Sequence, residues 1–596
     1  MQIQYKNNTL EKVLLGTNIL ASSIAAASLV LLYGFHQPRM SVEILYPVQL
    51  ILLIFFVAEK TIRFFNAVSK KDFFRANWFE IPLLLALAAA SLAADRLLYY
   101  ANAADAIRYA VGIYLAVQII VKLCRTCINM AASGRNPTQT LILSFLVLII
   151  TGAGLLMLPR ASAAAAENVE FIDALFTATS ATCVTGLTVK DTGTDFSLMG
   201  QLIILTLIQL GGLGIVVFGA VFALLLGQAL SLRERVAMQD ILSAGTLGKI
   251  GSMIVFIFAG TFIIETIGVI SLFGMWDNSP VWIGNVHHQW FASIFHSISA
   301  FCNAGLCLFS NSLGSYNRNW QVYGVICPLI VLGGLGFGVL YDLASIGIDR
   351  VKRFFKKHFS RNLSFLMEPP PRMLLQTKIV LTVSALLIIA GTLAIFFFER
   401  YAAQANPGRQ CGILDALFQS VTARTAGFST IDISALSPSS KFILILLMLV
   451  GGSPGGTAGG IKTVTLAVVI MAVITTLRKR DEVEIFGRSV RLILVRRAIT
   501  VMMLFIIVFF AAALALSVTE ASGGFTMLDI IFEAASALGT VGLSTGITAS
   551  LTTAGKSIII ALMLIGRLGP LTLLAALTFN IKPVRYGYPE EAIIVG

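Results

Sequence analysis

The chain has 596 residues, of which 57% are hydrophobic and only 12% are charged, and its formal net charge is +13. Apolar runs long enough to cross the roughly 30 Å hydrocarbon core of a bilayer recur along it, which excludes a soluble globular protein and predicts an all-α polytopic membrane protein. The positive charge is concentrated in alternate loops between these runs, which argues against nucleic acid as a partner and for a fixed membrane topology.

Twelve apolar runs predict twelve membrane spans. They lie at 12–35, 43–60, 79–100, 107–127, 139–158, 199–228, 250–275, 321–346, 377–398, 441–477, 492–517 and 556–580. The loops 350–378 and 478–497 are rich in Lys and Arg, whereas the loops 276–290 and 519–526 contain neither. The positive-inside bias therefore predicts a multi-pass protein of the cytoplasmic (inner) membrane with both termini in the cytoplasm. The basic loops are interpreted as topology determinants, and docking of a cytoplasmic partner is the alternative.

The first four runs predict an N-terminal four-helix membrane segment over residues 1–130. The stretch "EKTIRFFNAVSKKDFFRANWFEIPLLL", from Glu59, resembles the boundary between the second and third helices of voltage-sensor domains. A working sensor also needs a fourth helix with arginines at every third position, because the gating work scales with the charge moved. The fourth run offers only Arg108, Lys122 and Arg125. A structural role is therefore favoured over voltage sensing.

A fourfold internal repeat follows. Its core segments are "DALFTATSATCVTGL" from Asp173, "FHSISAFCNAGLCLF" from Phe295, "DALFQSVTARTAGFST" from Asp415 and "DIIFEAASALGTVGLST" from Asp529. The aligned glycines, which recur about every 120 residues, are Gly186, Gly305, Gly427 and Gly542. Each core segment lies between two long apolar runs, so we expect the order helix, short amphipathic helix, glycine turn, helix. The predicted pore repeats are 138–228, 248–346, 376–477 and 492–585.

The glycine turns suggest an ion path. Irregular backbone at membrane depth is tolerated only where it is buried in protein or lines water. The segments before the glycines are too short to span, and Asp173, Asp415 and Asp529 look like their helix caps or first-turn acids. Glycine can turn carbonyl oxygens inward, and a ring of carbonyls can replace the hydration shell of a monovalent cation. Four turns in one chain predict one complete ring.

The motifs "TSATCVTGLTV", "SAFCNAGL", "SVTARTAGFSTID" and "SALGTVGLSTGIT" resemble, in the same order, those of the Trk/Ktr/HKT superfamily of potassium transporters, and of its TrkH/KtrB-like membrane subunits in particular. The resemblance covers about residues 138–585 and implies a potassium selectivity filter built mainly of backbone oxygens. The implied ion-binding residues are Cys183, Val184, Thr185, Gly186, Cys302, Asn303, Ala304, Gly305, Thr425, Ala426, Gly427, Thr540, Val541 and Gly542. Cys302 departs from the family, which commonly has asparagine there.

The resemblance also bears on selectivity and on partners. In the family, four filter glycines go with potassium, whereas serine at the first goes with sodium permeation. K⁺ is thus the expected transported ion, and no further cofactor is expected. The expected partners are membrane lipid, a second copy of the chain in a homodimer, and a cytoplasmic RCK/KTN-type nucleotide-binding regulatory subunit like TrkA or KtrA.

The stretch "GGSPGGTAGGIKTVTL", from Gly451, almost matches a phosphate-binding loop, but Ile461 separates its last glycine from Lys462 and Thr463. Glycine and Pro454 disfavour helix, so we expect the inner helix of the third repeat to break here. The resemblance implies an intramembrane gating loop over 451–460. Its implied gate residues are Gly451, Gly452, Gly455, Gly456, Gly459, Gly460, Lys462 and Arg567.

Several alternatives stay open. Potassium uptake could be channel-like or coupled to Na⁺ or H⁺ in a symporter, and a sodium-permeable member of the superfamily is a further alternative. A nucleotide-dependent enzyme is disfavoured, because the longest cytoplasmic loop has only about 30 residues and neither a Mg²⁺-site acid nor a catalytic triad is evident. Glu265 lies within a spanning run and is either functional or paired with a neighbouring repeat.

Overall fold

The computed structural model describes residues 6–35, 40–76, 137–163, 169–214, 250–278, 286–359, 372–405 and 411–570, together with a few isolated positions between 84 and 118. These residues are mostly helical, as the composition predicts. They also include a short antiparallel hairpin of β1 (Val483–Ile485) and β2 (Arg488–Val490), which the sequence did not lead us to expect. Phe486 and Gly487 form its tip with φ values of 51° and 70°, a left-handed pair that suits a two-residue hairpin turn.

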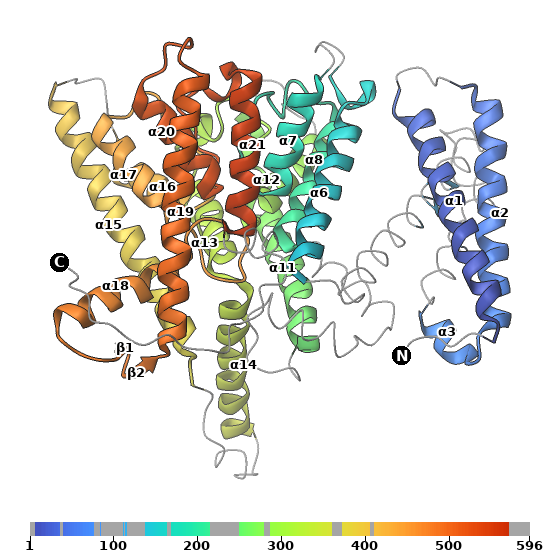
Figure 1. The fold of residues 1–596 in the computed structure, drawn as a ribbon, viewed down its shortest axis with the longest axis horizontal. Coiled ribbons are helices and arrows are strands. Elements are labelled where there is room, and N and C mark those ends of the chain that lie inside the picture. The colour runs from blue at the N-terminus through green and yellow to red at the C-terminus, as the bar shows by residue number, and fades with distance from the viewer. Residues whose placement is uncertain are drawn as a thin grey trace, which may run out of the picture.

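The N-terminal helices stand to one side of the other elements (Figure 1). They are α1 (Asn8–Tyr33), α2 (Val42–Asn66) and α3 (Lys70–Ala76). Helices α1 and α2 pack together, and Arg63 forms ion pairs with Glu11 at 3.3 Å and with Glu59 at 2.7 Å. Most of the third and fourth predicted spans lies outside the described residues. The four-helix segment and its structural role therefore stay predictions.

Each of the four repeats shows a long helix, a short helix that ends in a glycine turn, and a second helix. Repeat 1 contains α6 (Pro137–Leu156), α7 (Phe171–Thr182) and α8 (Leu198–Leu213). Repeat 2 contains α11 (Ile250–Leu272), α12 (Val286–Phe301), a π-helical turn (Val322–Ile326), α13 (Cys327–Leu335) and α14 (Phe337–Phe359). Repeat 3 contains α15 (Leu375–Ala405), α16 (Ile413–Thr422), α17 (Pro438–Leu449) and α18 (Thr463–Leu477). Repeat 4 contains α19 (Leu492–Thr519), α20 (Met527–Gly539) and α21 (Thr553–Leu568). Short 3₁₀ turns lie at Pro159–Ala161, Met275–Asn278, Gly314–Tyr316 and Thr548–Ser550.

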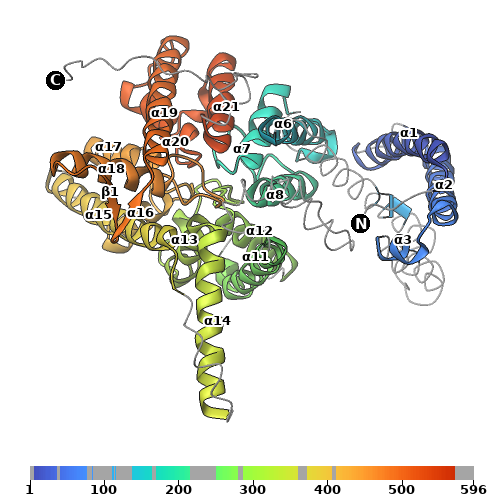
Figure 2. The ribbon, with the colours of Figure 1, turned by 60° about the horizontal axis from the view of Figure 1, so that its bottom comes forward.

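The repeats close into a cycle. The second helix of each repeat contacts the short helix of the next one: α8 contacts α12, α13 contacts α16, α17 contacts α20, and α21 returns to α7. Each short helix also packs against the long helix of its own repeat. Figures 1 and 2 show the helices of the four repeats packed into one bundle. The packing therefore brings the four glycine turns, which are far apart in sequence, to a common centre.

Hydroxyl caps fix the start of the second helix in three repeats. Ser197, Ser437 and Thr552 each accept a hydrogen bond from a first-turn N–H of the helix they precede. In repeats 3 and 4 a buried acid from the long helix holds the cap. Glu399 accepts from Ser437 Oγ at 2.7 Å, and Glu520 accepts from Thr552 Oγ1 at 2.6 Å. These bonds set where the chain leaves each glycine turn.

Two predicted spans are broken. Helix α17 ends at Leu449 and α18 begins at Thr463, so the inner helix of repeat 3 is interrupted where the glycines predict it. The run 321–346 was expected to be one span, but α13 and α14 are bent by 103°. Gly336, with φ of 84°, allows this bend. Figure 2 shows α14 extending away from the bundle.

Among the described residues, four continuous helices are by themselves long and apolar enough to cross a membrane, or five if the bent pair counts as one span. The four are Thr9–Tyr33, Ile250–Leu272, Leu375–Gln404 and Leu492–Thr519. Of the other predicted spans, 43–60 lies within α2, and the rest are represented by shorter apolar helices such as α8 and α17 or lie partly outside the described residues.

Candidate functional site

The four glycine turns share an unusual backbone conformation. The aligned glycines all have positive φ: 95° at Gly186, 67° at Gly305, 84° at Gly427 and 93° at Gly542. The residue two places earlier is also left-handed in every turn, at Val184, Asn303, Thr425 and Thr540, with φ between 52° and 75°. Left-handed conformation costs a non-glycine residue roughly 1–2 kcal/mol, and such residues cluster at ligand-binding sites. Its fourfold recurrence means that the surrounding packing imposes it.

The turns face one another around a closed cycle. A Cβ placed on Gly186 would lie 2.5 Å from the carbonyl oxygen of Ala304 in repeat 2. The equivalent contacts are Gly305 with the Ala426 oxygen at 2.6 Å, Gly427 with the Val541 oxygen at 2.5 Å, and Gly542 with the Thr185 oxygen. Each glycine therefore borders the carbonyl oxygen that precedes the glycine of the next repeat. No side chain fits between neighbouring turns, so backbone oxygens dominate this centre.

Hydroxyl groups of the short helices hold the turns in place. In repeats 1 and 4 the hydroxyl of the serine six residues before the glycine accepts a hydrogen bond from the N–H of that glycine. Ser180 Oγ accepts from Gly186, and Ser536 Oγ accepts from Gly542, both at 3.1 Å. In repeats 2 and 3 a hydroxyl instead donates to the carbonyl of the residue after the glycine: Ser299 to Leu306 at 2.8 Å and Thr422 to Phe428 at 2.7 Å. The carbonyls of Leu306 and Phe428 are thus already bonded within the protein.

Three threonine hydroxyls of the turns have no hydrogen-bond partner in the described part of the chain. They are Oγ1 of Thr185, Thr425 and Thr540, and all three residues are buried. Buried polar atoms are nearly always partnered by protein or ordered water. These hydroxyls are therefore available to a water molecule or a cation. Asn303 differs, because its amide, when oriented with the nitrogen toward the neighbouring acceptors, donates to the carbonyls of Ala300 at 3.0 Å and Ile330 at 3.1 Å.

Cys302, where the sequence departs from the family pattern, directs its side chain to a neighbouring repeat. Its thiol lies 3.7 Å from Gln209 Oε1 on α8, and Gln209 Nε2 donates to Glu265 Oε2 on α11 at 3.3 Å. The buried Glu265 is thus paired with a neighbouring repeat, which is one of the two interpretations that the sequence leaves open. The cysteine side chain contributes to inter-repeat packing.

The glycine-rich segment (residues 451–460) lies against the turns. Its ends are joined, since Gly451 N–H donates to Ile461 O at 2.9 Å and Ile461 N–H donates to Leu449 O at 3.0 Å. A Cβ on Gly459 would collide with the hydroxyl of Thr540 in the fourth turn. The segment also pairs with the bend of repeat 2 through Ser453 N–H to Gly334 O at 2.9 Å and Phe337 N–H to Gly455 O at 3.1 Å.

Both predicted gate cations bind carbonyls of the glycine-rich segment. Lys462 Nζ donates to Ala458 O at 2.6 Å. Arg567 of α21 donates to Thr457 O, and to the carbonyls of Gly211 and Gly212 in repeat 1. One guanidinium thus joins repeats 4, 3 and 1 beside the glycine turns. The structure brings the predicted gate residues together around one backbone segment.

A second repeated motif was missed in the sequence. "GGLG" occurs at 211–214 and at 333–336, and "GRLG" occurs at 566–569. A Cβ on the first glycine of each copy would clash with a carbonyl near the end of the short helix of the same repeat, at Thr182, Phe301 and Leu538. Arg567 occupies the second position of its copy. The threefold recurrence of this motif could have identified the place where the second helices pass beneath the turns.

The three first-turn aspartates lie at the starts of the short helices and also connect neighbouring repeats. Asp415 accepts from the Gly412 N–H at 3.3 Å, which is a capping bond, and also from Tyr323 Oη of repeat 2 at 2.9 Å. Asp173 forms an ion pair with Lys556 of repeat 4 at 2.6 Å, and Asp529 forms one with Lys441 of repeat 3 at 3.7 Å. In each case the partner belongs to the preceding repeat of the cycle. Capping alone is therefore too narrow a description of these acids.

These contacts predict a stability effect without a change in ion preference. Lys556→Met leaves Asp173 buried and unpaired, and removing one partner of such a pair costs on the order of 3 kcal/mol. We expect a lower midpoint of thermal unfolding for Lys556→Met and an unchanged potassium-to-sodium flux ratio for Asp415→Asn. Arg480→Ala, which breaks the exposed Arg480–Glu484 pair, is the matched control and should have little effect. A large change of selectivity from Asp415→Asn would show direct ion binding instead.

Helices of membrane-spanning character around a cycle of backbone oxygens define an integral membrane protein of the cation transport class. The family model for TrkH, a cation transport protein, matches residues 106–583, and the chain belongs to this family. This membership confirms the predicted family and the expectation that the chain is a transport protein rather than an enzyme. The first 105 residues lie outside the match.

Curated relatives and a solved structure agree with this assignment. Ktr system potassium uptake protein B of Bacillus subtilis is 38% identical over 467 residues, which cover 77% of this chain and 97% of that protein. Potassium/sodium uptake protein NtpJ of Enterococcus hirae is 36% identical, with 77% and 97% covered. The crystal structure of the potassium transporter TrkH from Vibrio parahaemolyticus superposes with a TM-score of 0.55 at 18% identity, covering 85% of this chain and 99% of that one. The last likeness supports the fold alone.

Proposed function

We propose that this protein takes up potassium across the cytoplasmic membrane through a selectivity filter formed by its four glycine turns. The closed cycle in which each glycine borders the carbonyl oxygen of the next repeat is the observation that carries the proposal. The names of the relatives from Bacillus subtilis and Enterococcus hirae, which describe potassium and potassium/sodium uptake proteins, support the choice of ion.

The filter binds K⁺ mainly through backbone oxygens. The carbonyls of Thr185, Ala304, Ala426 and Val541 replace part of the hydration shell of the ion, as carbonyl rings do in potassium channels. The unpartnered hydroxyls of Thr425 and Thr540 add oxygen ligands at one edge of the ring. The hydroxyl bonds from the short helices hold the four turns in place, so the ring does not have to reorganise when an ion enters.

The glycine-rich segment is the gate of this pathway. It contacts Thr540 at the filter, and its carbonyls are held by Arg567 and Lys462. Two cationic side chains beside the path repel K⁺, and bonds to the segment keep both of them there. The path opens when the segment leaves this position.

Transport without fixed coupling to a second ion is the favoured mode, and a symporter is the second candidate because the name of the Enterococcus hirae relative includes sodium. The two differ in their response to membrane potential. Channel-like flux follows the potassium gradient and the membrane potential, whereas a symporter keeps a fixed ratio of potassium to its coupling ion. Tracer flux at several imposed potentials, with and without sodium, separates them.

We attribute the regulation of transport to partner proteins. The relative from Bacillus subtilis is named as protein B of a Ktr system, which supports a further component. That component would be a cytoplasmic RCK/KTN-type nucleotide-binding subunit that docks on the basic loops, including the hairpin of β1 and β2, while the transporter itself forms a homodimer. Both termini would lie on the same cytoplasmic side.

The proposal is tested with the purified full-length chain in liposomes that are loaded with potassium, rubidium or sodium. We expect potassium and rubidium to move at similar rates and sodium much more slowly. Protein-free liposomes provide the background. Equal rates for all three ions in protein that elutes as a single species would contradict a potassium-selective filter.

A further inference from the structure

Arg424 has an unusual position in the third turn. It is 9% exposed and directly precedes Thr425, the first left-handed residue of that turn. The equivalent residues of the other turns are Cys183, Cys302 and Gly539. Only the third of the four turns therefore carries a charge at this position. No carboxylate of the described residues lies within 4.0 Å of the Arg424 guanidinium.

The guanidinium is held by backbone carbonyls instead. Its Nη2 donates to Gly451 O at 3.2 Å and its Nη1 donates to Ser384 O at 3.4 Å. Gly451 is the first residue of the glycine-rich segment, and Ser384 lies on the long helix α15. One side chain therefore connects the third glycine turn, the base of the glycine-rich segment and the outer wall of repeat 3.

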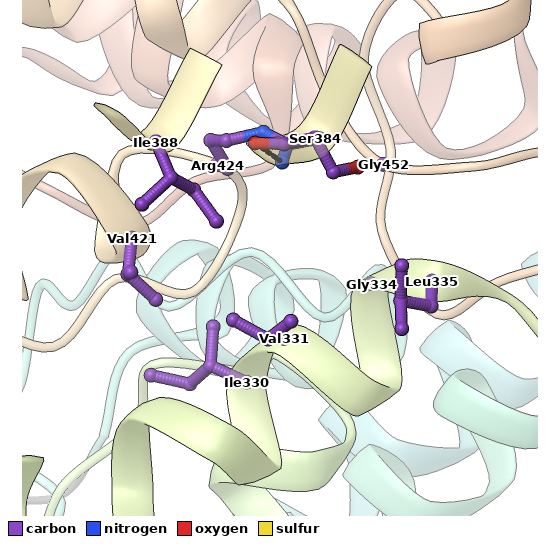
Figure 3. A pocket seen from close by; sticks show the side chains of 9 residues that line it. All are labelled: Ile330, Val331, Gly334, Leu335, Ser384, Ile388, Val421, Arg424 and Gly452. Atoms are coloured by element: carbon purple, nitrogen blue, oxygen red, sulfur yellow. Dashed lines mark hydrogen bonds between the residues drawn. The ribbon is translucent and has the colours of Figure 1, made fainter. Parts of the chain in front are cut away.

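A small cavity of about 20 Å³ adjoins this contact (Figure 3). Residues of α13, α15 and α16, most of them aliphatic, line it together with Gly452, and Arg424 is the one charged residue among the described residues of this lining. The cavity has room for about one water molecule, and Nε of Arg424 has no hydrogen-bond partner in the described part of the chain. The side of Gly452 that faces this cavity is thus loosely packed, and Arg424 adds a side-chain bond there to the backbone bonds that hold the base of the segment.

We propose that Arg424 is a positioning residue that anchors the base of the glycine-rich segment to the third filter turn. In gating, the part from Ser453 to Gly459 moves, while Gly451 and Gly452 stay attached. The anchor insulates the filter from this motion. The inference rests on the proposed function, and it adds a residue that acts on the filter and on the gate together.

Loss of the Arg424 anchor and loss of the gate should have different effects on potassium flux and on the potassium-to-sodium flux ratio. Arg424→Met has a long side chain without a donor, so the bonds that join the third turn to Gly451 and to Ser384 are lost. We expect potassium flux to rise several-fold and the potassium-to-sodium flux ratio to fall by about tenfold, which corresponds to about 1.4 kcal/mol of lost preference for potassium. Arg424→Lys keeps one charged donor and should fall between this variant and the parent.

The control is Ser384→Ala, because the bond from Arg424 uses the backbone oxygen of residue 384 and survives the substitution. It should match the parent in flux and in ratio. All variants are measured in liposomes as purified, monodisperse protein. If Arg424→Met is not monodisperse, Arg424→Lys decides the question by the same two readouts.

Two results would overturn the anchor. In the first, flux and ratio match those of Ser384→Ala. In the second, flux rises and the ratio stays at the parental value, so that Arg424 acts on the gate alone. A variant shortened between Ser453 and Gly459 is measured alongside. If that variant conducts no faster than the parent, the assignment of the glycine-rich segment as the gate is wrong. This outcome is distinct from failure of the anchor.

Discussion

Shortening the glycine-rich segment by removing Ser453 to Gly459 should raise potassium flux by more than about tenfold and leave the potassium-to-sodium flux ratio nearly unchanged, since each 1.4 kcal/mol of closed-state stabilisation corresponds to a factor of ten. The deletion removes the carbonyls of Thr457 and Ala458, which Arg567 and Lys462 hold. It also removes the backbone bonds to the bend of repeat 2. Flux of potassium and sodium in liposomes is the measurement.

The structure indicates that this deletion can be joined. A Cβ on Gly451 would lie 3.2 Å from the Cα of Gly460, so the two ends of the segment already meet. The Gly451–Ile461 and Thr463–Gly452 backbone bonds lie outside the deleted part. The filter turns are untouched, and for that reason selectivity should persist. A shortened, folded protein that conducts no faster than the parent would show that this segment is not the gate.

Arg567→Ala should act in the same direction but more weakly. It removes the charge-assisted bond to Thr457 while the backbone pairing of the segment with Gly334 and Phe337 remains. We expect a several-fold rise in potassium flux at constant ion ratio. Arg478→Ala, at an exposed cation beyond α18, is the control for loss of a positive charge. A rise of the same size in both variants would point to a general electrostatic effect rather than to the gate.

Gly186→Ser should raise sodium permeation relative to potassium by about tenfold or more, because it places a side chain among the carbonyls that replace the hydration shell of the ion. Gly186 has φ of 95°, and a Cβ there would lie 2.5 Å from the Ala304 oxygen. The first turn must shift to admit the serine side chain, and the carbonyl of Thr185 then leaves the ring of oxygens. Sodium and potassium fluxes in liposomes give the ratio.

Gly154→Ser is the matched control for this substitution. Gly154 lies in α6, and a Cβ on it meets nothing within 4 Å. The control should leave both fluxes at parental values. An unchanged ratio in a well-folded Gly186→Ser protein would contradict the assignment of the first turn to the filter. Raised flux of both ions in equal proportion would contradict it as well.

Local patterns in the sequence predict the elements that local chemistry determines. The break between α17 and α18 follows from glycines and Pro454, whose preferences act within a few residues. The short helices before Gly186, Gly427 and Gly542 follow from their length and their first-turn acids. The aligned glycines predict left-handed backbone because glycine alone adopts it at little cost.

Contacts between repeats could not be predicted in this way. The ion pair of Asp173 with Lys556 joins residues 383 positions apart, and nothing in either local sequence identifies the partner. The direction of Arg424 depends on where Gly451 lies after the chain has folded. The sequence predicts one continuous span through Gly336 where the structure has a bend, because a single glycine inside an apolar run does not by itself distinguish a bend from an ordinary helix.

The central claim is that four glycine turns form one cation-binding ring. Its most direct test is the anomalous scattering of rubidium in crystals of the full chain grown with Rb⁺ in place of K⁺. The claim predicts a rubidium peak at the centre of the cycle, within ligand distance of the carbonyl oxygens of Thr185, Ala304, Ala426 and Val541, and its disappearance when Na⁺ replaces Rb⁺. Rubidium peaks elsewhere in the protein, with none at this centre, would contradict it.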